Sequence, residues 1–189
     1  MKKVLFMPFL QISSGHHQVA KSVEDWLHFI EPSIECETVD ILSYAYGKGE
    51  TFVSQIYLKW ISSFPHVYSW LYRKNAIENK KKKRFRRYEI LFQSAMLKLI
   101  NEKKPDCIIC THALPSYILS CLKQKGMLSI PIINVYTDFF INTIWGTKMV
   151  NFHLVPHADF KEKLVQEDCV EENIFVTGIP VHPAFTRPF

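Results

Sequence analysis

The chain has 189 residues and a net charge of +5, and its 48% hydrophobic and 22% charged residues are typical of a globular protein with a filled core. No apolar run reaches the roughly 18 residues needed to cross a bilayer, and the run that follows Lys2 and Lys3 is too short for a secretory signal. These features argue against a membrane-spanning or secreted protein, and the expected location is the cytoplasm.

The N-terminal residues predict a strand, a loop and a helix. Val4 to Leu10 form a short apolar run, residues 11–15 form a turn, and His16 and His17 open a stretch with helical spacing. A helix N-terminus offers unpaired N–H groups and a partial positive charge, which suit a phosphate or an oxyanion. One face of this helix is expected to be apolar, formed by Val19, Val23, Leu27 and Ile30.

Residues 52–72 carry a helical apolar stripe with several aromatic side chains, among them Trp60, Trp70 and Tyr72, and Pro65 is expected to kink it. Tyrosine and tryptophan favour sites with one apolar and one wet side. Seven basic residues follow within eight positions: Lys80, Lys81, Lys82, Lys83, Arg84, Arg86 and Arg87. Together they favour an insertion at about 48–90 that lies on an anionic membrane. The alternative is a helix packed on the sheet, followed by a solvated charged face.

Strand and helix patterns alternate along the rest of the chain. Buried strands are predicted at 107–110 and 132–136, a last strand at 174–176, weaker strands at 34–41 and 152–155, and helices at 113–125 and 158–167. This alternation predicts an α/β fold, a Rossmann-like doubly wound parallel sheet, with residues 1–189 as a single domain.

The five cysteines do not form a disulfide framework. Cys107 and Cys110 match C-x-x-C, but they lie in a predicted strand, where residues three apart point to opposite faces. The redox motif of this spacing opens a helix instead, and no second pair completes a zinc site. We therefore expect them to be small core residues and expect no metal.

Polar residues follow three of the predicted strands. Gly15, His16 and His17 follow the first, Thr111 and His112 follow the strand at 107–110, and Thr137 and Asp138 follow the strand at 132–136. Because the carboxyl ends of parallel strands share one edge of a sheet, these groups are expected to meet at a ligand site. A histidine can take a proton from a hydroxyl, and a carboxylate can orient it. Each residue alone is more often a helix cap or a turn former.

Several common site motifs are absent. The sequence has no G-x-x-x-x-G-K-[ST] phosphate loop, no G-x-G-x-x-G dinucleotide fingerprint and no G-x-S-x-G nucleophile elbow. These absences exclude a P-loop NTPase and argue against a dinucleotide-binding enzyme or an esterase.

Five segments, in order and spanning nearly the whole chain, resemble the N-terminal domain of the monogalactosyldiacylglycerol synthase and processive diacylglycerol glucosyltransferase family. They are Ser14–Ala20 (SGHHQVA), Pro105-Asp106, Thr111–Pro115 (THALP), Val135–Phe139 (VYTDF) with Trp145, and Val176–Val181 (VTGIPV). The resemblance implies the N-terminal half of a GT-B glycosyltransferase. The C-terminal half, which in such enzymes supplies most of the nucleotide-sugar site, is expected to be absent here.

By resemblance, His16 acts at the acceptor hydroxyl or the phosphate and Asp138 is the candidate general base. Gly15, His17, Thr111, His112, Thr137, Asn142 and Trp145 are candidates for binding the acceptor or phosphate, and residues 52–87 match the acceptor and membrane region. Relatives often have a histidine where this chain has Asn142, and an asparagine cannot exchange a proton at neutral pH.

The resemblance implies the acceptor-binding half of an inverting enzyme that moves a hexose from a UDP-sugar to diacylglycerol or a glycolipid. No permanently bound cofactor is expected. The expected partners are anionic membrane lipid, a diacylglycerol-type acceptor and a separate donor-domain chain, at the inner face of the cell membrane. Alone, the chain is not expected to be active.

Two other functions stay open from the sequence. The first is a non-catalytic lipid-binding or regulatory module that retains only the acceptor domain. The second is a nucleic-acid binder that uses the basic block, which we do not expect because no motif beyond the charge run supports it.

Overall fold

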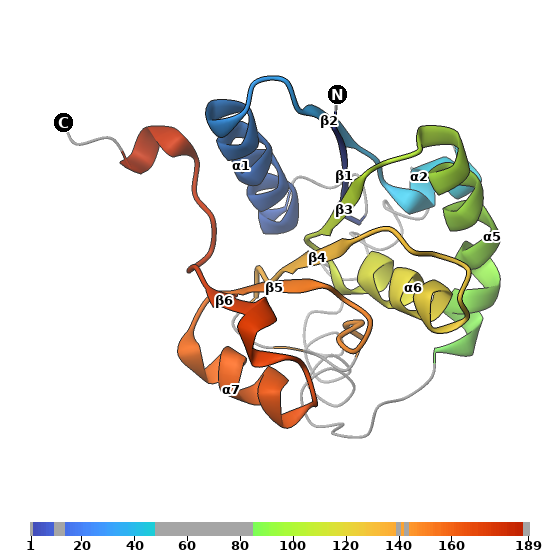
Figure 1. Cartoon of the computed structure of the whole chain (residues 1–189). Coiled ribbons are helices and arrows are strands. Elements are labelled where there is room, and N and C mark those ends of the chain that lie inside the picture. The colour runs from blue at the N-terminus through green and yellow to red at the C-terminus, as the bar shows by residue number, and fades with distance from the viewer. Residues whose placement is uncertain (1, 10–13, 48–84, 139–140, 142–143, 187–189) are drawn as a thin grey trace, which may run out of the picture.

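The computed structural model describes residues 2–9, 14–47, 85–138, 141 and 144–186 (Figure 1). In chain order the elements are β1 (Lys3–Met7), α1 (Gly15–Ile30), β2 (Glu35–Thr38), α2 (Ile41–Tyr46), α5 (Arg86–Lys103), β3 (Cys107–Cys110), α6 (Ala113–Gln124), β4 (Ile132–Val135), β5 (Phe152–Val155), α7 (Ala158–Gln166), the 3-10 turn η2 (Glu171–Asn173), β6 (Ile174–Val176) and the 3-10 turn η3 (Pro183–Thr186). The aromatic stripe and most of the basic block, residues 52–84, lie outside the described residues.

The described strands form one parallel sheet in the order β2-β1-β3-β4-β5-β6. The chain steps in one direction from β1 to β2 and in the opposite direction from β2 through β6. Because such crossovers are right-handed, α1 lies on one face and α2, α5, α6 and α7 lie on the other (Figure 1). The predicted Rossmann-like, doubly wound α/β fold is confirmed.

The two faces bury separate apolar clusters. Leu5, Ile108 and Ile132 belong to the larger cluster, under the four helices of one face, whereas Phe6 and Ile109 belong to the smaller cluster beneath α1. The successive residues of each strand thus alternate between the faces, as period-two geometry requires. Cys107 packs against the smaller cluster and Cys110 lies in the larger one, which confirms their predicted place in the core on opposite faces.

Two helices were not predicted, and one predicted face was partly wrong. α2 begins directly after Asp40, whose carboxylate accepts the Leu42 N–H at 3.0 Å, so the expected strand at 34–41 ends early. α5 was not predicted because it begins at the end of the charge run at 80–87. It buries Phe92, Met96, Leu99 and Ile100 at helical spacing. Ile30, expected on the buried face of α1, is 72% exposed in the last turn of that helix.

Gly126 closes the C-terminal end of α6, as the sequence indicated. The Gly126 N–H donates to the Lys123 carbonyl at 2.9 Å and the Met127 N–H to the Leu122 carbonyl at 3.0 Å, which is a Schellman motif. This motif needs a left-handed residue, and Gly126 has a φ of +69°.

Candidate active site at the carboxyl edge of the sheet

The carboxyl ends of β1, β3 and β4 meet around the side chain of His16. His16 is the second residue of α1, and its Nδ1 lies 2.9 Å from the backbone carbonyl oxygen of Thr111, which follows β3. The same nitrogen lies 2.6 Å from Oγ1 of Thr137, which follows β4. The expected convergence of polar groups at this edge therefore occurs, with His16 at its centre.

The partners of His16 determine where its proton lies. A carbonyl oxygen only accepts hydrogen bonds, so the contact with Thr111 requires a proton on Nδ1 of His16. The Thr137 hydroxyl then accepts from the same N–H and lies 3.5 Å from the Thr111 carbonyl. In the neutral ring, Nε2 therefore carries the free lone pair. Nε2 is the nitrogen that could accept a proton from a ligand.

His112 packs against His16 and is held neutral. Its ring is edge-on to that of His16, with centroids 4.9 Å apart, and lies 5.1 Å from the ring of Phe9. Burial lowers the pKa of His112 to about 3, and His16 and His17 add smaller effects. Its Nδ1 accepts the Leu114 N–H at 3.2 Å, so His112 caps α6 and its Nε2 carries the proton.

His17 and Ser14 contact each other at the start of α1 beside His16, and both are half-buried. Nδ1 of His17 lies 3.2 Å from Oγ of Ser14, which therefore does not cap α1 with its side chain. Burial lowers the pKa of His17, Asp40 opposes that shift and His16 adds to it.

The other candidate residues vary in their placement. Gly15 is exposed at the start of α1, and Asp138 is half-buried directly after Thr137 and makes no hydrogen bond or ion pair with another described residue. Trp145 is only 5% exposed and packs on Tyr136, with ring centroids 4.5 Å apart. Asn142 lies outside the described residues.

Of the predicted membrane residues, Arg86 and Arg87 are exposed in the first turn of α5. The remainder lie outside the described residues: Trp60, Trp70, Tyr72, Lys80, Lys81, Lys82, Lys83 and Arg84.

A buried polar group beneath the edge was not predicted. Tyr136 donates its hydroxyl proton to Nδ1 of His153 at 3.0 Å and accepts from the Asn134 amide at 3.3 Å. The Asn134 amide also donates to the Gly146 carbonyl at 3.0 Å. Burial lowers the pKa of His153 to about 4, so the ring is neutral and can accept this proton. The polar Asn134 within the apolar strand 132–135 was the available signal.

Gly146 allows the loop that carries Trp145 to lie directly against α6. A Cβ at position 146 would come within 2.5 Å of the Ser116 carbonyl oxygen and of Cβ of Ser120. The Ser116 hydroxyl also donates to the Gly146 carbonyl at 3.1 Å. The buried polar group therefore fixes the chain on both sides of Thr137 and Asp138.

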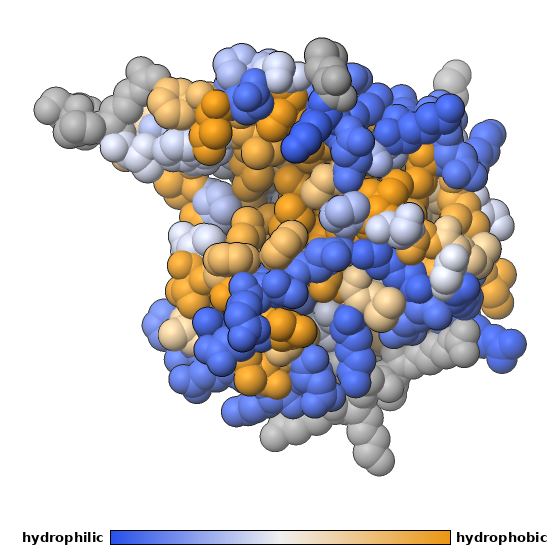
Figure 2. All heavy atoms as spheres, viewed as in Figure 1, coloured by the Kyte–Doolittle hydropathy of each residue, from blue (hydrophilic) through white to orange (hydrophobic). Residues whose placement is uncertain are grey.

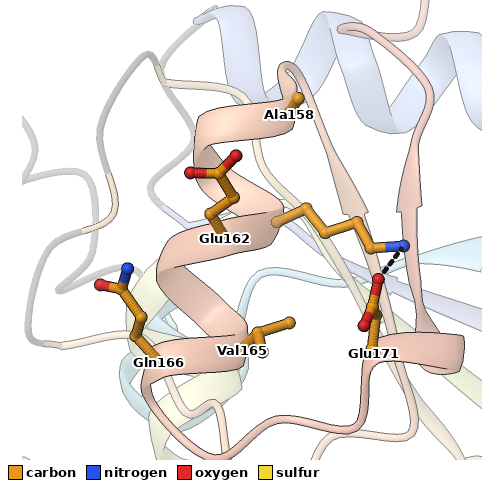
Figure 3. A pocket seen from close by; sticks show the side chains of 6 residues that line it. Ala158, Glu162, Val165, Gln166 and Glu171 are labelled. Atoms are coloured by element: carbon orange, nitrogen blue, oxygen red, sulfur yellow. Dashed lines mark ion pairs between the residues drawn. The ribbon is translucent and has the colours of Figure 1, made fainter.

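A pocket of about 530 Å³ lies beside α7 and shares no residue with the His16 group. Figure 3 shows Glu162, Val165 and Gln166 on one side of it, with Glu171 paired to Lys161 at 3.3 Å. Its charged groups are paired or exposed, and it brings no nucleophile or base near the carboxyl edge.

Within the described ranges, no group of three or more histidine, cysteine or carboxylate side chains is arranged as a metal site requires. Nor does any described helix combine the length and apolarity that crossing a membrane requires.

The parallel sheet with helices on both faces defines a Rossmann-like α/β domain, and in such sheets the carboxyl edge is where ligands bind. The likeness to solved structures supports this class. The chain matches the Staphylococcus aureus MnaA–UDP co-structure with a TM-score of 0.56 and 15% identity, covering 95% of this chain and 46% of that one. It matches the apo form of the lipopolysaccharide outer core galactosyltransferase WaaB with a TM-score of 0.52 and 14% identity, covering 93% and 45%. The domain is thus of the kind that forms one half of GT-B proteins, as the sequence indicated.

Residues 16–181 match the family described as monogalactosyldiacylglycerol (MGDG) synthase, and the chain belongs to this family. It is 44% identical to the uncharacterized glycosyltransferase YkoN of Bacillus subtilis over 98% of this chain and 49% of that protein. It is 30% identical to the processive diacylglycerol beta-glucosyltransferase of Bacillus pumilus over 97% of this chain and 47% of that protein. The chain spans about half the length of the curated relatives it matches, the N-terminal half.

Proposed function

We propose that this chain is the acceptor-binding half of a glycosyltransferase that moves a hexose from a UDP-sugar to diacylglycerol or a glycolipid. The observation that carries the proposal is the arrangement of His16, whose Nδ1 proton is fixed by Thr111 and Thr137 so that Nε2 is free to act as a base. The names of the diacylglycerol glucosyltransferase relatives support the choice of acceptor.

In the proposed reaction the acceptor hydroxyl oxygen attacks the anomeric carbon of the sugar. A new carbon–oxygen bond forms there, and the bond from that carbon to the phosphate oxygen of UDP breaks with inversion. The hydroxyl proton passes to Nε2 of His16 or to the carboxylate of Asp138, and UDP departs with the bonding electrons.

We place the chain at the inner face of the cell membrane as a peripheral protein. The basic block, of which Arg86 and Arg87 are described and exposed, supplies the attraction to anionic lipid. The UDP-sugar is expected to bind mainly to a donor half of the kind that the relatives carry.

The test combines this chain with the C-terminal half of YkoN, produced as a separate chain, and measures hexose transfer from UDP-sugars to diacylglycerol in anionic vesicles. Transfer that requires both chains supports the proposal. Absence of transfer by a folded and assembled pair contradicts it. If lipid binding persists in His16→Ala and Asp138→Ala without transfer by the unmodified pair, the chain is a lipid-binding module instead.

A further inference from the structure

α5 carries apolar side chains on its outer face as well as on its inner one. The inner face buries Phe92 and Met96 in the larger cluster, whereas Ile90 is 74% exposed and Leu91 is 52% exposed. Residues three and four apart are neighbours on a helix, so Ile90 and Leu91 both lie next to the exposed Arg87. Figure 2 shows orange spheres beside blue ones at its right-hand edge, over α5.

α2 extends this exposed apolar surface. Tyr46, the last residue of α2, is 46% exposed, and its hydroxyl donates to the Leu91 carbonyl at 3.3 Å. The Tyr46 ring also lies 5.9 Å from that of Phe92. Contiguous exposed apolar groups with polar residues at their border are typical of interaction sites. We define the α2–α5 face as the exposed residues Tyr46, Arg86, Arg87, Ile90 and Leu91.

The charges of this face are all positive. Arg86 and Arg87 are its charged members, and four lysines and an arginine precede them at positions 80–84 of the sequence. Glu89 is the one acidic residue between positions 86 and 98, and it is only 3% exposed. Its carboxylate faces the end of α6, where Lys125 lies 3.3 Å away. The α2–α5 face therefore attracts anions and presents no carboxylate that would repel them.

Buried hydrogen bonds fix the start of α5. The Phe85 N–H donates to the Tyr117 hydroxyl at 2.8 Å, and that hydroxyl donates to the Glu89 carboxylate at 3.1 Å. Because Tyr117 belongs to α6, these bonds join the first turn of α5 to α6. They set the rotation of α5 about its axis, and with it the outward direction of the α2–α5 face.

The α2–α5 face lies at the same edge of the sheet as His16. α5 leads into β3, so its C-terminal end is at the amino edge and its first turn is at the carboxyl edge (Figure 1). The Phe92 ring lies 6.3 Å from that of Phe9, which in turn lies 5.1 Å from that of His112. His112 packs on His16. A surface that binds the α2–α5 face would therefore lie beside the candidate active site.

We infer that the α2–α5 face lies on an anionic lipid bilayer, with Ile90 and Leu91 inserted among the headgroups and Arg86 and Arg87 on the lipid phosphates. Apolar side chains bordered by arginine suit this interface, and tyrosine is frequent there. Nucleic acid fits less well, because it is bound by cations and by stacking on aromatic rings and gains little from two aliphatic side chains. The inference rests on the membrane placement in the proposed function and adds the side chains that enter the bilayer.

The experiment measures sedimentation of the chain with vesicles of phosphatidylglycerol and phosphatidylcholine. The variants are Ile90→Ser and Leu91→Ser, and the matched control is Val170→Ser, because Val170 is 58% exposed and precedes η2 outside this face. All three side chains are exposed, so circular dichroism and thermal melting should show folded variants. We expect each of the first two variants to weaken binding about tenfold and the control to leave it unchanged.

Salt separates the apolar contribution from the charged one. Arg87→Gln should weaken binding about fivefold at low salt and much less at high salt, because salt screens the attraction between charges. The loss in Ile90→Ser should persist at high salt, since burial of apolar surface is not screened. Vesicles of phosphatidylcholine alone should bind the unmodified chain more weakly, and equal binding to both vesicles would contradict the role of the arginines.

Three results would overturn the inference: no binding of the unmodified chain to anionic vesicles, unchanged binding by Ile90→Ser and Leu91→Ser, or variants that only dissolve a self-associated form of the chain. Hexose transfer by the pair with the YkoN half separates this failure from that of the proposed function. The two variants should lower transfer to diacylglycerol in vesicles and leave transfer to a short-chain diacylglycerol in solution unchanged. Absence of transfer to either acceptor contradicts the proposed function, whereas vesicle binding alone decides the α2–α5 face.

Discussion

Strand β4 supports two histidine groups that use the same chemical types and differ in their access to solvent. At its carboxyl end, Thr137 contacts His16 in a group whose residues are half-buried. One residue earlier, Tyr136 contacts His153 in a group sealed in the core, where His153 is 2% exposed. Both histidines contact a hydroxyl through Nδ1, but His16 is half-buried whereas His153 is buried. Hydrogen bonding alone therefore does not distinguish the two histidines, which differ in their burial.

The largest expected difference between the two groups is in catalysis. His16→Ala should lower kcat/KM of the pair assembled with the YkoN half by about 10²- to 10⁴-fold, the usual contribution of a general base. Its melting temperature should change little, because the lost side chain is partly exposed. Steady-state transfer assays and thermal melts measure both quantities. A variant with unchanged kcat/KM would show that Asp138, or another group, takes the proton.

The next effect concerns the sealed group and stability. Gly146→Ala should lower the free energy of unfolding by about 1–3 kcal/mol, because the added Cβ would overlap backbone and side-chain atoms of α6. Gly15→Ala is the matched control, since a Cβ added there would meet no packed neighbour within 4 Å and its φ is not left-handed. Urea unfolding curves of both variants give the comparison. Equal stability of the two variants would mean that the loop at 144–147 can move away from α6.

Acid should destabilise the protein through its buried neutral histidines. The pKa of His112 falls to about 3 and that of His153 to about 4 in the folded chain, against 6.5 for the unperturbed ring. Below pH 6.5 the unfolded chain binds protons that the folded chain does not, so stability is complete above that pH and is lost progressively toward pH 4.

His112→Asn tests this dependence, because asparagine keeps an N-cap for α6 and does not titrate. The variant should lose about 1–2 kcal/mol less than the unmodified chain between about pH 6.5 and pH 5. Unfolding titrations at a series of pH values measure the two slopes. Parallel slopes would show that His112 protonates as readily in the folded chain as in the unfolded one.

The smallest effect is expected at Ser14, beside His16 and His17. Loss of an N-cap side chain usually destabilises a helix by about 1 kcal/mol, but Ser14 makes no side-chain cap bond and its hydroxyl contacts His17. Ser14→Ala should therefore change the free energy of unfolding by less than about 0.5 kcal/mol. Asp40→Ala, which removes a true cap of α2, should cost more in the same urea titration. A Ser14 variant as unstable as the Asp40 variant would contradict this role.

The sequence was sufficient for the parallel sheet and for the meeting of three strand ends, because both follow from apolar runs and from the direction of parallel strands. It was not sufficient for α5, whose first residues, Arg86 and Arg87, belong to a run of charged residues. Nor did it reveal the His153 group, since Tyr136 and His153 are 17 positions apart and meet only through the register of β4 and β5. The contact of His16 with a backbone carbonyl was equally invisible, because any residue could provide that oxygen.

The contact of His16 with the Thr111 carbonyl oxygen determines which substitutions the site can tolerate. The proton on Nδ1 of His16 is directed by the main chain at position 111, not by the threonine side chain, whose buried Oγ1 makes no hydrogen bond to the described residues. The path of the backbone therefore sets the tautomer of His16. Other small side chains could replace the threonine at position 111 without changing which ring nitrogen is free, so genetic drift there would leave the chemistry of His16 untouched.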